Sequence, residues 1–136
     1  MGTTNYTNTF IQVAEDCPVQ EAQVPPVSGK VPTIAQLHHR LIADHPYEFT
    51  SDDVLFTVHA IRHGIPVDVR ARERAAFFAK DQACLRSSPL GKRYGWGVHH
   101  DEDGRVALVP LGSDQYRALA GDPRVRQLVA MRSTRA

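Results

Sequence analysis

Side chains capable of chemistry concentrate in one segment, residues 84–100 (CLRSSPLGKRYGWGVHH). It contains three lysine or arginine residues, two serines, three glycines, two histidines and the only tryptophan, but no acidic residue. Cationic and hydroxyl donors bind anions, glycines let the backbone approach a ligand closely, and an indole stacks on planar groups. The segment therefore predicts a binding site for an anionic or planar small molecule.

The ligand-binding candidates are Arg86, Ser88, Lys92, Arg93, Trp96 and His99. The three cations would supply charge, the serine a hydrogen bond, the indole a stacking surface and the imidazole a route for protons. If the site is catalytic, His99 would transfer the proton, and Cys84 is a second candidate because neighbouring cations favour a nucleophilic thiolate. We expect at least two of Arg86, Arg93 and His99 to line one pocket.

A purely structural interpretation of this segment stands beside the functional one. Strand alternation places Trp96 and His99 on opposite faces, and the glycines share the His99 face. That face is either a platform for a ligand or the place where a helix packs closely on the sheet. In the second case, the arginines would form ion pairs with Glu48, Asp52 or Asp53.

Two histidines have the spacing of metal ligands. His59 and His63 lie four residues apart on a predicted helix, so both imidazoles could reach one ion. No third ligand is marked by spacing, although His38–His39 or His99–His100 could provide one in space. The interpretation that we favour is two partly exposed helix histidines, and no metal or other cofactor is predicted.

Composition limits the class of protein. The 136 residues are 42% hydrophobic, enough for one globular domain over residues 1–136, and carry a net charge of +1. No run reaches the roughly twenty apolar residues of a membrane span, and no secretory signal is visible at the N-terminus. With only Cys17 and Cys84, a disulfide framework is not expected, and a cytoplasmic protein is the expected class. The balanced charge also argues against a nucleic-acid partner.

Periodicity and punctuation predict an α+β fold: a small antiparallel sheet of about three strands covered by four or five helices. The expected strands are residues 9–14, 94–100 and 105–109, the last two joined by a hairpin turn at Asp101–Gly104. Residues 18–32, rich in proline, form an irregular loop. The expected helices are residues 34–42, 51–61, 67–80, 113–120 and a last one opening at Asp122–Pro123.

The C-terminal end of the chain is rich in arginine. Residues 117–136 hold five arginines and one acidic residue, a local charge of +4. Such a surface attracts anions or an acidic partner. An alternative function is therefore a non-catalytic interaction module or homodimer that uses this last helix, with an exposed apolar patch at Val125, Leu128 and Met131.

Several segments together resemble a small bacterial family of unknown function, family 6157. These segments are residues 8–11, 13–18, YEFTSDDVLF at 47–56, residues 84–86 and 88–90, KRYGWG at 92–97, and residues 130–133. The resemblance covers nearly the whole chain. It implies a stand-alone domain of cytoplasmic type and assigns no activity, cofactor or site residue.

Overall fold

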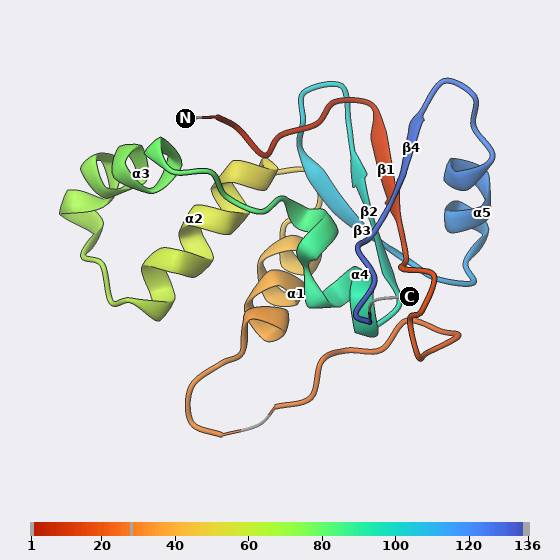
Figure 1. Ribbon diagram of the computed structural model, residues 1–136, viewed down its shortest axis with the longest axis horizontal. Helices are drawn as coiled ribbons and strands as arrows, with labels where there is room; N and C mark the ends of the chain where they lie inside the picture. The colour runs from red at the N-terminus through yellow and green to blue at the C-terminus, as the bar shows by residue number, and fades with distance from the viewer. Residues whose placement is uncertain (1, 28, 135–136) are drawn as a thin grey trace.

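Three antiparallel strands form where the sequence predicts them. The computed structural model describes residues 2–27 and 29–134, and in it β1 (Thr9–Gln12), β2 (Trp96–His100) and β3 (Val106–Pro110) lie side by side. The turn between β2 and β3 contains Gly104 at φ 78°, a left-handed conformation that glycine adopts without steric cost. The predicted hairpin is thus confirmed (Figure 1).

A fourth strand replaces the predicted last helix. β4 (Arg126–Val129) pairs in parallel with β1, which gives a mixed sheet of order β3-β2-β1-β4. The prediction of a helix from Asp122–Pro123 is wrong because so short a segment gains little stability as a helix. It gains more by satisfying the open backbone groups along β1. The α+β class is confirmed, with one strand more than expected.

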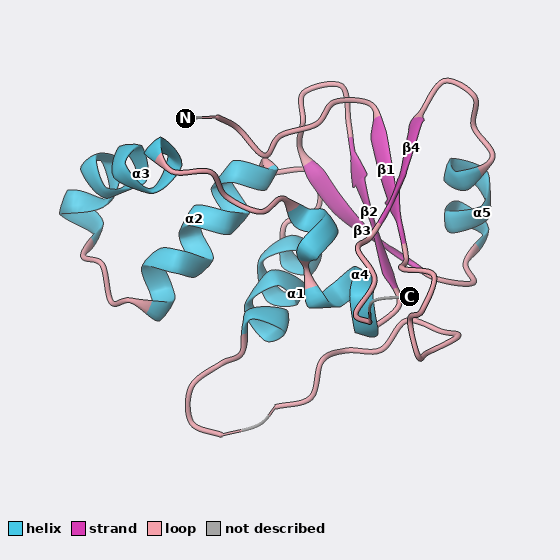
Figure 2. Cartoon of the chain, in the orientation of Figure 1, coloured by secondary structure: helices cyan, strands magenta, loops and turns pink. Residues whose placement is uncertain are grey.

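The described residues form five α-helices (Figure 2). They are α1 (Ile34–Asp44), α2 (Ser51–Arg62), α3 (Arg70–Ala79), α4 (Pro89–Arg93) and α5 (Asp114–Ala120). Most of them pack beside the sheet, with α3 further out beyond α2. Short 3₁₀ turns at Val67–Val69 and Leu85–Ser87 precede α3 and α4. No helix is predicted from the sequence for residues 89–93, where α4 forms.

Local capping explains where three of the helices begin. The side chains of Thr33 and Thr50 each accept a hydrogen bond from a backbone N–H of the first turn, and the side chain of the third helical residue accepts one from the backbone N–H of the cap. This reciprocal capping box satisfies two backbone donors that a helix otherwise leaves open. Ser113 caps α5 in the simpler way. The predicted starts of the helices at residues 51 and 113 agree with the structure to within one residue.

The two faces of the sheet pack against different helices. On one face Ile11, Val98 and Val106 are buried together with Ile42 of α1 and Val54 of α2. On the other face α5 lies over β1 and β3 (Figure 1). This arrangement leaves α1, α2 and α4 together on one side, where a cavity of about 550 Å³ forms.

The third helix is peripheral. No residue of α3 is buried. An ion pair of 2.8 Å from Arg74 to Asp53 and the ring of Phe77 hold α3 against α2. Few apolar contacts therefore fix this helix in place.

The proline-rich loop, residues 18–32, contains no helix or strand in the part of it that the structure describes. Its apolar side chains Val24 and Val27 are 67% and 85% exposed. The indole N–H of Trp96 donates to the carbonyl of Gln23 at 2.8 Å and ties the loop to β2. None of the described helices combines the length and apolar character needed to cross a bilayer.

Apart from residues 117–120, which end α5, the arginine-rich end is not helical in the part of it that the structure describes. Arg117 and Arg124 form ion pairs with Asp114 and Asp122, and the guanidinium of Arg126 lies 5.9 Å from the ring centre of Tyr6. Arg135 lies outside the described residues. Within the predicted apolar patch, Val125 and Leu128 are half-buried beside β1, and only Met131, at 51%, is exposed.

Candidate functional site

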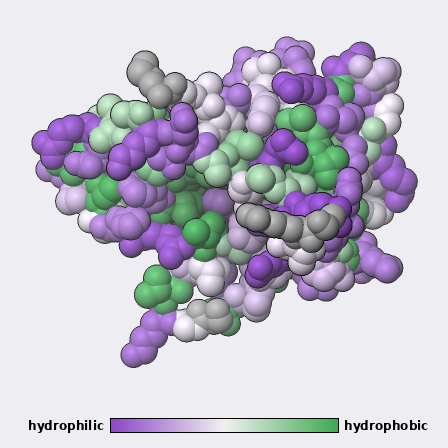
Figure 3. All heavy atoms as spheres, viewed as in Figure 1, coloured by the Kyte–Doolittle hydropathy of each residue, from purple (hydrophilic) through white to green (hydrophobic). Residues whose placement is uncertain are grey.

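The largest cavity described lies between α1, α2, α3 and the segment that leads into α4. Its volume is about 550 Å³. Figure 3 shows apolar side chains gathered in the hollow on this side of the molecule. The lining residues are Ile34, His38, Leu55, Val58, His59, Arg62, His63, Phe77, Gln82, Ala83, Cys84, Ser87, Ser88 and Pro89. The cavity thus combines apolar walls with a limited set of polar groups.

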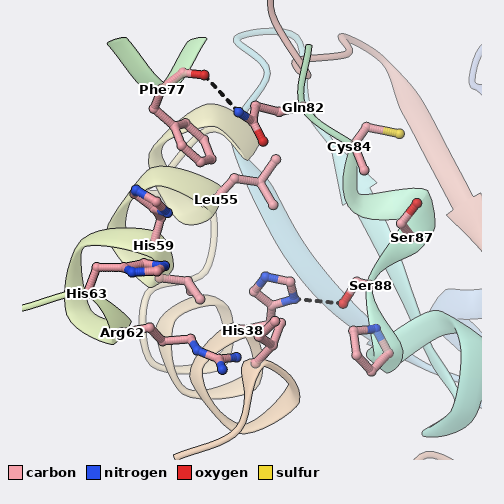
Figure 4. A pocket seen from close by; sticks show the side chains of 14 residues that line it. His38, Leu55, His59, Arg62, His63, Phe77, Gln82, Cys84, Ser87 and Ser88 are labelled. Atoms are coloured by element: carbon pink, nitrogen blue, oxygen red, sulfur yellow. Dashed lines mark hydrogen bonds between the residues drawn. The ribbon is translucent and has the colours of Figure 1, made fainter. Parts of the chain in front are cut away.

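Helical geometry gathers the polar groups on the α2 side. His59, Arg62 and His63 are separated by three and four residues, so they project from one side of the helix. The rings of His59 and His63 lie 4.4 Å apart, and Phe77 of α3 lies 4.5 Å from His59 on its other side. Figure 4 shows this column of rings facing Ser87 and Ser88 across the cavity.

The floor of the cavity is a buried histidine–serine pair. His38 of α1 is 4% exposed and Ser88 is 3% exposed, with 2.8 Å between His38 Nδ1 and Ser88 Oγ. Burial lowers the pKa of His38 from its ordinary value of 6.5 to about 4, because desolvation penalises the imidazolium. His38 is therefore neutral at physiological pH.

The electrostatic environment of the cavity favours anions. Within the described part of the chain, no Asp or Glu lines the cavity, and Arg62 has neither an ion pair nor a hydrogen-bond partner. Burial and the neighbouring His63 lower the pKa of His59, although nearby Glu73 opposes this shift. Arg62 is thus the fixed positive charge at the site.

A second hollow adjoins the first. It has a volume of about 410 Å³, shares Ile34, Arg62 and Pro89 with the main cavity, and adds Arg93 and Tyr94. Arg93, like Arg62, has no ion-pair or hydrogen-bond partner among the described residues. The two guanidinium groups therefore border one continuous depression.

The structure does not bring the predicted binding residues together. Ser88 lines the main cavity and Arg93 the adjoining hollow, whereas Arg86, Lys92, Trp96 and His99 line neither. Of Arg86, Arg93 and His99, only Arg93 borders this depression, so the expected shared pocket is not found here.

Two of the predicted binding residues are engaged within the protein. The Arg86 Nε–H donates to the carbonyl of Val129 at 2.8 Å and holds β4 against the turn before α4. His99 Nδ1 lies 2.9 Å from the Tyr47 hydroxyl, and burial lowers the pKa of His99 while nearby Asp101 opposes the shift. Both side chains stabilise the fold at these positions.

The glycine face of β2 is filled by aromatic side chains. A Cβ atom on Gly97 would lie 2.7 Å from the ring of Phe10 and 3.0 Å from that of Tyr116 in α5. The helix-packing interpretation of the glycines therefore holds at Gly97.

The acids expected to pair with the arginines of residues 84–100 have other partners. Asp53 pairs with Arg74, Glu48 with His45, and Asp52 accepts hydrogen bonds from Thr3 and Thr4. The purely structural interpretation of residues 84–100 predicts ion pairs with these acids, and the described residues do not form them. Arg86 donates to a backbone carbonyl instead, and Arg93 borders the second hollow.

Cys84 borders the cavity but is not paired with a histidine. Its sulfur lies 3.4 Å from the Tyr6 hydroxyl and, in Figure 4, is turned away from His59 and His63. His100 is fully buried with its ring against the edge of Tyr6, at 5.5 Å between ring centres. A Cys–His catalytic pair with His99 or His100 is thus not formed.

The two α2 histidines lack further metal ligands. Among residues 2–27 and 29–134, no group of three or more His, Cys, Asp or Glu side chains has an arrangement suited to a metal ion. His38–His39 and His99–His100 do not complete a set with His59 and His63. The pair instead contributes to the wall of the cavity.

The pair of His38 and Ser88 resembles a catalytic nucleophile and its general base, because those two groups also lie within hydrogen-bond distance of each other. Ser88 is nearly inaccessible, and its Oγ accepts the Leu90 N–H as the cap of α4. The following Pro89 has no N–H with which to stabilise an oxyanion. The geometry therefore suits positioning of the His38 ring rather than attack on a substrate.

The residues that the sequence analysis missed come from α1, α2 and α3. Arg62 and Phe77 carried no motif, and their proximity depends on how the helices cross. One residue in the sequence does indicate this site. His38 is an imidazole within the apolar stripe of its helix, and a buried polar group needs a hydrogen-bond partner.

The fold and the cavity define a small α+β protein with a cavity that has apolar walls and cationic edges. The chain belongs to the family of unknown function DUF6157, whose model matches residues 1–136. Neither the curated proteins nor the solved structures contain a match to this chain.

Proposed function

We propose that this protein binds a small organic anion with an apolar body in the cavity between α1, α2 and α3. The observation that carries this proposal is a 550 Å³ cavity in which Leu55, Val58 and Phe77 meet the unpaired Arg62 and the buried His38. Its volume lies within the range of about 300–1,000 Å³ typical of small-molecule sites. Apolar walls with a few polar groups are also typical of such sites.

The proposed ligand is the anionic or planar molecule expected from the sequence, placed at a different site. Ser88 and Arg93 remain part of its surroundings, while Arg62, His38 and Phe77 are new. Rings of His59 and Phe77 offer a stacking surface for a planar ligand. Charge comes from Arg62, with Arg93 in the adjoining hollow.

We propose binding without a chemical step. The pKa of His38, about 4, makes it a weak base at neutral pH, and Ser88 is occupied as a helix cap. Both cysteines are free thiols, which fits the proposed cytoplasmic location.

The cavity can be blocked without disturbing the core. Ala83 lines the cavity and is exposed, so the indole of Ala83→Trp would occupy ligand space. Ala76, which is exposed on α3 and does not line the cavity, provides the matched control Ala76→Trp.

The assay is fluorescence titration with 8-anilinonaphthalene-1-sulfonate, an apolar anion that brightens on leaving water. Ala83→Trp should weaken binding at least tenfold, or about 1.4 kcal/mol. Ala76→Trp should bind as the wild type does. Equal affinity for Ala83→Trp and the wild type would show that the probe binds elsewhere and would refute the proposal.

A further inference from the structure

We propose that the cavity binds the carboxylate of its ligand between the Nε2–H of His38 and the guanidinium of Arg62, and that Ser88 fixes the required tautomer of His38. This inference rests on the proposed function and specifies the chemical class of the ligand. It is a carboxylic acid with an apolar, preferably aromatic, body.

The tautomer follows from the hydrogen bonds of Ser88. Its Oγ accepts the Leu90 N–H at 3.2 Å and lies 2.8 Å from His38 Nδ1. Among the described residues, no other acceptor lies within reach of the Ser88 hydroxyl proton. A buried hydroxyl group donates its proton wherever a partner exists, so Ser88 donates to His38 Nδ1.

An accepting Nδ1 determines the other ring nitrogen. In a neutral imidazole, one nitrogen carries the proton and the other accepts, so His38 carries its proton on Nε2. Burial keeps the ring neutral by lowering its pKa, so only one of the two nitrogens carries a proton. The ring thus has one N–H whose direction is set by the contact with Ser88.

This N–H points into the cavity. Figure 4 shows the second ring nitrogen of His38 turned toward the space below Leu55, away from Ser88. No described residue accepts a hydrogen bond from it, yet it is not sealed in the interior as both nitrogens of His100 are. An unpaired N–H among apolar side chains is stabilised when it gains a hydrogen-bond acceptor, and a ligand in the cavity can supply that acceptor.

Arg62 supplies the charge that makes the acceptor an anion. Figure 4 shows its guanidinium turned toward His38 across the lower part of the cavity. A planar guanidinium matches the geometry of a carboxylate, and a charge-assisted hydrogen bond is stronger than a neutral one. One cation and one neutral N–H together suit a monoanion, with the apolar part of the ligand toward Leu55 and Phe77.

The test compares an acid with its neutral counterpart. The probes are 2-naphthylacetate and 2-naphthylacetamide, which share the apolar body and differ in charge, and the readout is calorimetric titration. The wild type should bind the acid at least tenfold more tightly than the amide. Inorganic phosphate, added as a competitor at equal concentration, should not displace the acid, and displacement would overturn the assignment to a carboxylate.

Three variants separate the two donors. Arg62→Gln removes the charge and should abolish the preference for the acid while leaving amide affinity within about twofold. His38→Asn keeps an amide near Nδ1 for Ser88 but removes the cavity donor, to which an oxygen of either probe can bind, so it should weaken acid and amide alike. His38→Gln places an N–H near Nε2 and should retain part of the wild-type affinity. Arg105→Gln, an exposed hairpin residue that does not line the cavity, is the control and should behave as the wild type.

The outcomes distinguish this inference from the proposed function. If the wild type binds acid and amide equally and Ala83→Trp abolishes both, the cavity binds ligands but the carboxylate assignment is wrong. If neither probe binds, both proposals fail.

The tautomer has its own spectroscopic signature. Long-range ¹H–¹⁵N correlation spectra of the wild type should show His38 protonated at Nε2, and Ser88→Ala should shift the ring toward protonation at Nδ1. A wild-type spectrum with the proton on Nδ1 would overturn the proposed role of Ser88, whether or not the variant folds.

Discussion

Mild acid should destabilise this protein, because two histidines are buried as neutral rings. His38 and His100 are 4% and 0% exposed, and burial lowers the pKa of each from 6.5 to about 4. For His100 the backbone at Val98 and Thr9 opposes this shift, although no hydrogen bond of normal geometry reaches either ring nitrogen.

The sign and size of the effect follow from proton linkage. Between pH 6.5 and 4 the unfolded chain binds protons that the folded chain excludes, so the free energy of unfolding falls as pH falls. A shift from 6.5 to about 4 corresponds to about 3 kcal/mol per histidine below pH 4, and to about 2 kcal/mol between pH 7 and pH 5. Such losses are large against the roughly 5–15 kcal/mol that stabilises a typical domain.

The carboxyl groups do not account for losses in this window. The pKa of Asp16, Asp53 and Asp122 is lowered in the folded protein, so their stabilisation is lost only as pH falls below about 4. Histidines His39 and His59 are shifted in the same direction as His38, which makes a comparison with variants necessary.

The assay is urea unfolding followed by the fluorescence of Trp96, the only tryptophan, at pH 7 and pH 5. His100→Leu removes one buried ring without breaking a hydrogen bond of normal length, and it should reduce the loss of stability on acidification by about 2 kcal/mol. His45→Leu, at a side chain 42% exposed, is the matched control and should keep the wild-type loss. If wild type and His100→Leu lose the same stability from pH 7 to pH 5, the argument from burial is wrong.

Two further predictions concern packing and the N-terminal segment. Gly97→Ala places a Cβ 2.7 Å from the Phe10 ring, so we expect a loss of about 1–3 kcal/mol in urea unfolding; an unchanged midpoint would mean that Phe10 and Tyr116 repack freely. Asp52→Ala removes the acceptor for the Thr4 backbone and hydroxyl donors, at 2.8 and 2.6 Å, and should cost about 1–2 kcal/mol while accelerating amide exchange before β1. Unchanged exchange at Thr4 would contradict the role assigned to Asp52.

The site was only partly predictable because its residues are distant in sequence. The composition of residues 84–100 predicts a binding site, yet in the structure Arg86 donates to a β4 carbonyl and Trp96 donates to a carbonyl of the proline-rich loop. Such backbone partners leave no pattern in the sequence. Arg62 carries no motif, and among the described residues it has no ion pair, because Asp53 pairs with Arg74 and Asp52 accepts hydrogen bonds from the N-terminal threonines.

The sequence by itself determined the local features of this protein. Capping by Thr50 and Ser113, the glycine turn of the β2–β3 hairpin and the irregular proline-rich loop depend on a few neighbouring residues. These interactions form within one turn of chain, and therefore their residue types reveal them.

Only the tertiary structure decided the rest. Residues 126–129 became a parallel strand because β1 offered unpaired backbone groups that a short helix could not match. The cavity is lined by residues of α1, α2 and α3, and the His38 ring in it lies within hydrogen-bond distance of Ser88, fifty residues away in the sequence. Packing between distant segments fixes such features, and so the pattern of any single segment does not contain them.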